Sequence, residues 1–477
     1  MATYLSSAWI FGVVCVFTLC LDVVIREILL PYVLPELHVG EGFVFGGDSL
    51  GFHQNAALLA EQIREHGWSR WQLKPGPAGD SPVGIAAALY AVFGANPLVL
   101  LPLNAAVHGL SAVLLVTILC HVSVRRVDAA WGALPFVLFP TAAYWHSQLH
   151  RDGIYILGIY AWLAGTLLLF RPEAMTVRRW ATTLGLIVLG GALTWLSRPY
   201  VMVVIAGLTG GAALLLGGFG VRWMKRRQLR PAHLLARVAF LLVLCVALRA
   251  VGGAGRTDIP DYAIDRYTRV PASAPAPPPV QAPAGVAVDS AGATVPAEEQ
   301  LRLRREQCQQ WQDTAYVPRV LEDLALSLVV TREGSYGSSY LGARTTLDWQ
   351  RCIMSVGDLV AYLPRAVQIG LFAPFPSQWF ESSASGGRAA RALAGGEMLL
   401  AYLAMAAAVL SAWRFRRRPE LWVVLFVALA MLVLYAIATP NLGTQHRMRY
   451  GFLMLVVGLG VAELSARLRR RAGPEIQ

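Results

Sequence analysis

The sequence predicts an all-α membrane protein: a polytopic bundle of about ten transmembrane helices, with re-entrant or interfacial helices and a small outer cap. Of its 477 residues, 56% are hydrophobic and only 15% are charged, and the mean hydropathy is +0.51. Soluble domains are about a quarter charged, so a chain this apolar needs lipid as its solvent. The net charge of +12 comes from short basic clusters between apolar runs, which is typical of membrane orientation rather than nucleic-acid binding.

Apolar runs of about 17 to 25 residues are long enough to cross a bilayer core of about 30 Å. Such runs occur at 8–31, 98–121, 128–146, 153–171, 180–197, 199–219, 234–252, 396–413, 420–438 and 449–466. We expect the first to be a retained helix, because it contains Asp22, Arg26 and Glu27 and no small-residue cleavage site follows. Asp22 and Arg26, four residues apart, could pair on one helix face. Two shorter stretches, Val83–Phe93 and Leu359–Phe372, are expected to be re-entrant or interfacial helices.

The basic clusters predict which side of the membrane each loop occupies. They are Arg125–Arg126, Arg178–Arg179, Arg222 with Lys225–Arg227, Arg414 with Arg416–Arg418, and Arg469–Arg471. All of them fall on one side if Val83–Phe93 does not cross. The positive-inside bias assigns that side, with both termini, to the cytoplasm. The expected location is a bacterial-type inner (plasma) membrane.

This topology divides the chain into three parts. Residues 1–252 form an N-terminal transmembrane module with a first outer loop at 32–97, and residues 396–477 form the C-terminal transmembrane helices and a basic tail. Residues 253–395 form an outer segment. Within it, the Pro/Ala-rich stretch 271–297 cannot bury a core and is predicted to be a disordered linker.

A small folded cap is expected after that linker. Helices are predicted over Glu298–Gln312 and Arg319–Val330. Cys308 and Cys352 both fall in the outer segment, where an oxidising compartment would permit a disulfide between them. The sequence leaves this bridge open, because it does not show whether the two Cα atoms approach within bonding range.

The first outer loop carries a Gly-Gly-Asp-Ser turn in which Asp48 directly follows the first span. Charge at a membrane edge costs several kcal/mol, so it usually persists because it has a task. The Asp48 carboxylate could accept a proton from a sugar hydroxyl. The alternative is that Asp48 or Ser49 caps the helix that follows. His53, at the end of the same motif, is a further site candidate.

The turn after the third span reads His-Ser-Gln-Leu-His-Arg-Asp. Arg151 and Asp152 could belong to a functional site or form a capping turn with a local ion pair. His150 could be catalytic or simply an interfacial polar residue. His146 and His150 are spaced as two ligands on one helix face could be, but no Glu lies between them, so no metal site is predicted.

Cations on the outer side break the positive-inside pattern. Arg447 and Arg449, with His446, suit an anionic ligand such as a lipid phosphate, which guanidinium groups bind bidentately. Contact with lipid headgroups or with acidic residues of the outer loops is the alternative. Arg198 and Lys74 could serve the same role.

The order of these features resembles the membrane glycosyltransferases of the C superfamily (GT-C), which contains the protein O-mannosyltransferases and the lipid A aminoarabinose transferases. The resemblance covers about residues 1–200. Its motifs are the Asp48 loop, Lys74-Pro75, Ser81-Pro82, Phe93-Gly94, a span with Pro102 that ends at Arg125–Arg126, Phe139-Pro140-Thr141, and Leu149-His150-Arg151-Asp152.

The resemblance implies an enzyme that transfers a sugar from a polyprenyl-phosphate-linked donor to an outer-face or periplasmic acceptor, which is a glycan, a lipid or a protein. In that family an acidic residue of the first loop acts as catalytic base or organises the site, which matches Asp48. The acidic residue of the second outer turn matches Asp152. Asp48 has no second acidic neighbour and the second turn is Arg-Asp rather than Asp-x-Asp, so the motifs give a divalent metal little support and predict no cofactor.

An inverting transfer needs a base for the acceptor hydroxyl and cations for the departing lipid phosphate. Asp48 would be that base. The phosphate would be bound by Arg151, Arg447, Arg449 or Lys74. Membrane lipids are the other expected partner, and nucleic acid is not one. Two alternatives remain: a lipid-linked polysaccharide polymerase or ligase that depends on 253–395, and a non-enzymatic lipid-sugar transporter, whose paired broken helices in two related halves the sequence does not show.

Overall fold

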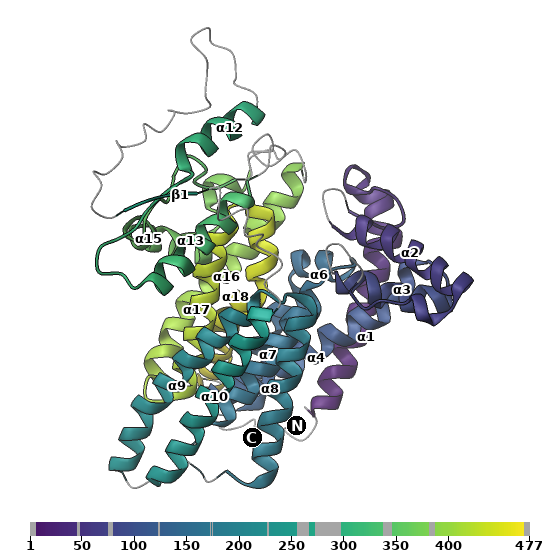
Figure 1. Cartoon of the computed structure of the whole chain (residues 1–477). Coiled ribbons are helices and arrows are strands. Elements are labelled where there is room, and N and C mark those ends of the chain that lie inside the picture. The colour runs from purple at the N-terminus through teal and green to yellow at the C-terminus, as the bar shows by residue number, and fades with distance from the viewer. Residues whose placement is uncertain are drawn as a thin grey trace. The chain divides into compact units, whose positions relative to one another are not determined.

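The computed structural model describes residues 6–44, 48–74, 80–122, 125–171, 173, 175–226, 229–254, 267–271, 297–336, 346–380 and 387–471 (Figure 1). The predicted linker at 271–297 lies almost wholly outside these residues. In chain order the elements are α1 (Ser7–Val24), η1 (Ile25–Val33), η2 (Pro35–Leu37), α2 (Ser49–His66), η3 (Trp68–Arg70), α3 (Ser81–Phe93), η4 (Pro97–Leu100), α4 (Leu101–Val122), α5 (Arg126–Leu138), α6 (Pro140–His146), α7 (Asp152–Leu168), α8 (Val177–Ser197), α9 (Val201–Lys225), α10 (Pro231–Ala254), β1 (Thr268–Val270), α12 (Ala297–Cys308), β2 (Gln310–Gln312), α13 (Arg319–Gly334), α15 (Val356–Phe372), η6 (Pro376–Gln378), α16 (Gly387–Phe415), α17 (Pro419–Ala438) and α18 (Leu442–Arg471).

The helical membrane fold is confirmed. Within the described ranges, nine helices are long and apolar enough to cross a membrane. They are Ser7–Val33, Pro97–Val122, Asp152–Phe170, Val177–Ser197, Val201–Lys225, Pro231–Gly252, Arg391–Phe415, Pro419–Ala438 and Leu442–Arg471. The chain is therefore a multi-pass membrane protein, and these nine segments correspond to nine of the ten predicted crossings.

The remaining predicted crossing, 128–146, is divided into two shorter helices. α5 ends at Leu138 and α6 begins at Pro140, because proline lacks the amide hydrogen that would continue the helix. The end of α6 lies beside the start of α4, where Asn104 donates to the carbonyl of His146 at 2.9 Å. The two short helices therefore run back along α4. Neither is among the nine described helices that are long and apolar enough to cross a membrane, so the tenth crossing stays a prediction.

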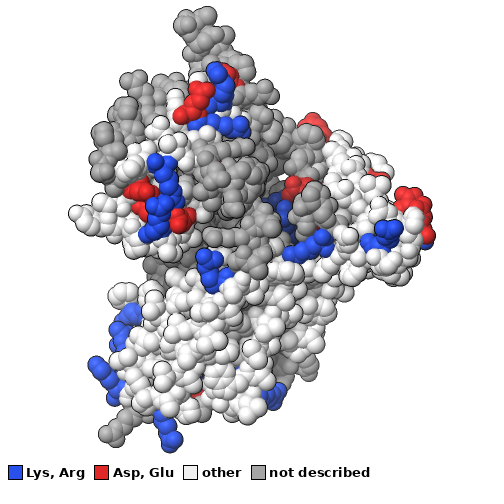
Figure 2. Space-filling view, viewed as in Figure 1, with Lys and Arg blue, Asp and Glu red and all other residues white. Residues whose placement is uncertain are grey.

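Both ends of the described chain lie at the same end of the bundle. Arg126, which begins α5, donates to Ser7 at the start of α1 (2.7 Å). Two residues later, Asp128 pairs with Arg469 near the end of α18 (2.6 Å). The start of α1, the start of α5 and the end of α18 therefore lie close together in unit 1. In Figure 2 the wall of spans is nearly free of charge, and Lys and Arg lie along its lower rim.

Close backbone approach holds the C-terminal helix in place. A Cβ atom built on Gly460 of α18 would lie 1.7 Å from the carbonyl oxygen of Ala404 in α16, and one on Gly132 of α5 would lie 2.5 Å from the carbonyl of Gly458. Helices in lipid associate through packing rather than hydrophobic expulsion, so small residues at such crossings are required.

The chain divides into two compact units. Unit 1 comprises residues 1–256, 399–428 and 453–477, and unit 2 comprises residues 257–398 and 429–452. The outer segment of the sequence therefore does not form a domain alone, because one end of α17 and the start of α18 belong to the same unit.

Unit 2 contains the predicted cap, with one correction. The first helix ends at Cys308 rather than Gln312, and Gln310–Gln312 instead forms strand β2, which pairs in parallel with β1. Trp311 is the reason. Its indole is fully buried and donates to the Glu322 carboxylate of α13 at 2.9 Å, a tertiary contact that overrides the helical pattern. The second helix, α13, begins at Arg319 as predicted.

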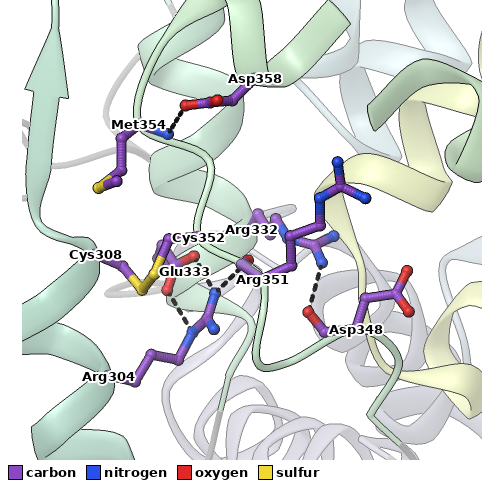
Figure 3. The surroundings of a disulfide bond; sticks show 9 residues. All are labelled: Arg304, Cys308, Arg332, Glu333, Asp348, Arg351, Cys352, Met354 and Asp358. Atoms are coloured by element: carbon purple, nitrogen blue, oxygen red, sulfur yellow. Dashed lines mark hydrogen bonds and ion pairs between the residues drawn. A yellow bond between two sulfur atoms is a disulfide. The ribbon is translucent and has the colours of Figure 1, made fainter. Parts of the chain in front are cut away.

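The disulfide between Cys308 and Cys352, which the sequence left open, is present in the structure, with the two Cα atoms 5.3 Å apart. Figure 3 shows it joining α12 to the segment before α15. Beside it, Arg304 of α12 makes a buried bidentate pair with Glu333 of α13, at 2.6 and 2.9 Å. The bridge and the ion pair thus fix the same helix to two different parts of the cap.

Removing the disulfide is expected to loosen this cap. A bridge across 44 residues should stabilise unit 2 by about 2–4 kcal/mol, mainly by restricting the unfolded chain. We expect the double variant Cys308→Ser/Cys352→Ser to be cleaved faster than the native protein in limited proteolysis of unit 2. Cys245→Ser, in span α10, is the matched control. Equal protection in the double variant and the control would contradict a bracing role.

Candidate functional site

Buried polar contacts within unit 1 fix the turn between α6 and α7. Arg26 of η1 is buried and donates to the carbonyl of Ser147 at 2.9 Å, and Gln148 donates to the carbonyl of Gly42 at 3.0 Å. The Arg26 guanidinium is therefore hydrogen-bonded to main-chain carbonyl oxygens. Neither oxygen of Asp22 has a hydrogen-bond partner in the part of the chain that the structure describes, so the suggested Asp22–Arg26 pair is not hydrogen-bonded.

His150 joins this turn to the first outer loop. Its Nε2 lies 3.0 Å from the hydroxyl of Ser49, the first residue of α2. The neighbouring Asp48 occupies the N-cap position of α2, yet its carboxylate makes no capping hydrogen bond, and the residue is exposed. The structure therefore gives no support to a capping role for Asp48, and it brings the two predicted acidic turns to one place.

Arg151 pairs across space rather than with its neighbour in sequence. Its guanidinium lies 3.1 Å from the carboxylate of Asp80, directly before α3, and stacks over the ring of Phe52 with 5.9 Å to the centroid. About a third of the Arg151 side chain stays exposed. The Arg151–Asp152 ion pair considered from the sequence is therefore wrong, because each residue has a partner elsewhere.

Asp152 begins α7 and forms a buried ion pair with Arg198, which follows α8. The Arg198 side chain is 1% exposed, donates to the hydroxyl of Tyr200 at 2.6 Å and lies over the ring of Tyr155. A guanidinium buried this deeply against a carboxylate fixes the position of that carboxylate. Arg198, predicted as a possible phosphate ligand, thus positions Asp152.

His53 lies one helical turn after Ser49 on α2, between two other side chains. Its Nε2 is 2.9 Å from the Glu41 carboxylate and its Nδ1 is 3.0 Å from the Tyr90 hydroxyl. Burial lowers the pKa of His53 below its ordinary value, against the opposing effect of Glu41. The imidazole is therefore neutral near pH 7. It connects α2 to α3 through Tyr90 and to the preceding loop through Glu41.

Lys74 contacts the end of α8. Its ammonium group donates to the carbonyl of Trp195 at 2.8 Å and lies 4.0 Å from the centroid of the Trp195 ring. A cation over an indole face is attracted by the ring quadrupole. Pro75 of the Lys-Pro motif lies outside the described residues.

The predicted outer cations of α18 belong to unit 2. Arg449 is fully buried, and its guanidinium donates to the carbonyls of Ile369 (3.0 Å) and Gly370 (2.9 Å) and to that of Ala373. These contacts favour a structural role over phosphate binding. His446 lies 3.4 Å from the same guanidinium. Arg447 is half-buried.

Asp80, Glu41 and Tyr90 were missed by sequence reasoning. Asp80 directly precedes the Ser81-Pro82 helix start, and that signal could have drawn attention to it. Glu41 and Tyr90 have no comparable signal, because only the folding of α3 against α2 brings them to His53. Among the residues that the structure describes, no three His, Cys, Asp or Glu side chains are grouped to hold a metal ion.

Comparisons with known proteins give a likeness of structure only. No family model and no curated protein matches the chain. One similar solved structure is the oligosaccharyltransferase AglB of Archaeoglobus fulgidus with an inhibitory peptide and a dolichol-phosphate, at 15% identity and a TM-score of 0.49 over 98% of this chain and 52% of that one. Another is the apo form of the Archaeoglobus fulgidus oligosaccharyltransferase, at 14% identity and a TM-score of 0.48 over 100% and 53%. This chain spans about half the length of those proteins.

Proposed function

We propose that this membrane protein is a glycosyltransferase of the GT-C type, which transfers a sugar from a polyprenyl-phosphate-linked donor to an acceptor hydroxyl. The observation that carries the proposal is the 3.0 Å hydrogen bond between Ser49 and His150. It joins the turn of Asp48 to the turn of Asp152, the two acidic positions that resemble the GT-C motifs. The turn that carries an exposed carboxylate thus contacts the turn that leads to a second, rigidly held one.

The proposed chemistry uses the residues of unit 1. Asp48 takes the proton from the acceptor hydroxyl, whose oxygen attacks the anomeric carbon of the sugar while the bond to the lipid phosphate breaks. The phosphate leaves as an anion, which a guanidinium or ammonium group stabilises. Arg151 suits this role best, because part of its side chain is exposed. Lys74 is the second candidate, and Arg447 in unit 2 stays a prediction from the sequence.

The end of the bundle that carries both chain ends is proposed to face the cytoplasm of a bacterial-type cell. The support is the positive-inside bias, because the basic residues Arg126, Arg418 and Arg469 belong to that end. The opposite end, with Asp48 and Asp152, would then face the periplasm. A donor in the outer leaflet and a glycan, lipid or protein acceptor would reach the site from that side.

The test is a transfer assay with the purified full chain in liposomes that contain a polyprenyl-phosphate-linked sugar and an acceptor extract. Release of the polyprenyl phosphate with a matching glycosylated product is the expected result. We expect Arg151→Ala to raise the KM for the donor by roughly 10- to 100-fold, since a hydrogen bond to a charged group contributes about 1.5–3 kcal/mol. Arg70→Ala, an exposed arginine of the same outer loop, is the matched control. An unchanged donor KM in Arg151→Ala would remove Arg151 from the site.

A further inference from the structure

The helix α15 has three distinct faces. Tyr362, Ala366 and Ile369 are buried in the core of unit 2. A second face, which we name the α15 stripe, is apolar and recurs every three or four residues: Val360, Leu363 and Val367 are exposed, and Leu371 is half-buried. Val360 is 56% exposed and Val367 40%. Polar residues lie between the two apolar faces, at Asp358, Arg365 and Gln368.

The C-terminal half of this helix lies well inside the depth of the spans. A Cβ atom on Gly370 would be 2.8 Å from the carbonyl oxygen of Leu432, so the two helices touch backbone to backbone. Leu432 is six residues before the end of α17, which corresponds to about 9 Å at 1.5 Å per residue. α17 itself has 20 residues, or about 30 Å, which just matches the hydrocarbon core. Gly370 therefore lies about 9 Å inside the end of α17, and α17 is only as long as the hydrocarbon core is thick.

The main-chain carbonyls at the end of α15 are hydrogen-bonded by protein groups, as is required where water is absent. The last carbonyls of a helix have no partner within it, and an unsatisfied one in lipid costs several kcal/mol. Arg449 of α18, seven residues from the start of that helix, donates to the carbonyls of Ile369 and Gly370 in the last turn of α15 and to that of Ala373 directly after it. The Ile369 carbonyl also accepts from the Ala373 amide, and the same guanidinium contacts Met398 and His446. Arg449 thus fixes the end of α15 to α18 within a buried site.

We propose that α15 is a membrane-inserted helix whose stripe lies among the acyl chains of the leaflet around the α17–α18 connection. The depth of Gly370 and the exposed apolar residues of the stripe point to lipid as the occupant. The opposite face packs on the cap, so the helix ties the cap of unit 2 to the membrane surface. Because the argument uses no catalytic residue, it holds whether or not the chain transfers sugars.

The test measures the environment of single nitroxide labels in the full chain reconstituted in phosphatidylcholine–phosphatidylglycerol liposomes. Cys15, Cys20, Cys120 and Cys245 are first replaced by Ser, and the disulfide is kept. Labels are then placed on the stripe through Val360→Cys and Val367→Cys. Arg302→Cys on the polar helix α12 serves as the water reference, and Val409→Cys on the exposed face of α16 serves as the lipid reference. Collision rates with molecular oxygen, which enters lipid, and with a water-soluble nickel chelate are compared.

We expect both stripe labels to collide several-fold more with oxygen than with nickel, as the Val409 label does. Collision mainly with nickel, as for the Arg302 label, would place the stripe in water and overturn the proposal. Protection from both reagents would mean that a protein surface, such as a second copy of this chain, covers the stripe, and it would overturn the proposal as well. Two labels are used so that a local disturbance by one substitution does not decide the result.

Discussion

Replacing Asp48 with Asn is expected to reduce the rate of sugar transfer by about 10²–10⁴-fold, the usual contribution of a general base. Asn keeps the size and most of the hydrogen bonding of Asp but does not accept the proton of the acceptor hydroxyl. Donor binding should therefore survive, so that kcat falls while the Kd for the lipid-linked sugar changes little. The measurement is single-turnover transfer in liposomes together with a donor-binding titration.

Two features of α2 make this substitution informative. Asp48 is exposed and Asn has nearly the same size, so the change should leave folding intact. Asn also caps a helix about as well as Asp, and a role limited to capping therefore predicts near-normal transfer. The control is Glu65→Gln, an exposed acid at the far end of the same helix. Near-normal transfer by Asp48→Asn would defeat the assignment of the base.

Replacing Arg198 with Met is expected to lower the free energy of unfolding of unit 1 by about 3–5 kcal/mol. The side chain of Arg198 is buried against Asp152, and removing one partner leaves the other charge in a site of low dielectric. The measurement is the apparent Tm of the purified protein in detergent. Arg179→Met is the matched control, because Arg179 pairs with Glu173 at the surface and such pairs contribute about 0–1 kcal/mol.

A double variant separates the ion pair from other effects of the substitution. Arg198→Met/Asp152→Leu removes both charges and should recover part of the lost stability, since a buried ion pair is often replaceable by apolar packing. Transfer should nevertheless stay low, because the second acidic turn has lost its carboxylate. A double variant less stable than Arg198→Met would show that Asp152 stabilises the fold independently of Arg198.

The sequence by itself determined the crossings, because a helix must be apolar over the whole thickness of the bilayer wherever its neighbours lie. This local requirement placed nine spans without knowledge of any contact. The sequence also limited the candidate disulfide to Cys308 and Cys352, the two cysteines outside the spans, but only the structure shows that they approach closely enough to bond. Pro140 marks where 128–146 divides into two helices, whereas the course of the two halves along α4 depends on the tertiary structure.

The partners of the charged residues were decided by the tertiary structure alone. Their adjacency in the sequence suggested that Arg151 pairs with Asp152. In the folded chain Arg151 pairs with Asp80 and Asp152 pairs with Arg198, because consecutive side chains at a helix start point in different directions. The place of Arg449 at the outer end of a span suggested phosphate binding. In the structure it instead donates to carbonyls at the end of α15, a helix more than 70 residues away in the chain. A charge in or near lipid must find a partner somewhere, and which partner it finds depends on which helices pack together rather than on the local sequence.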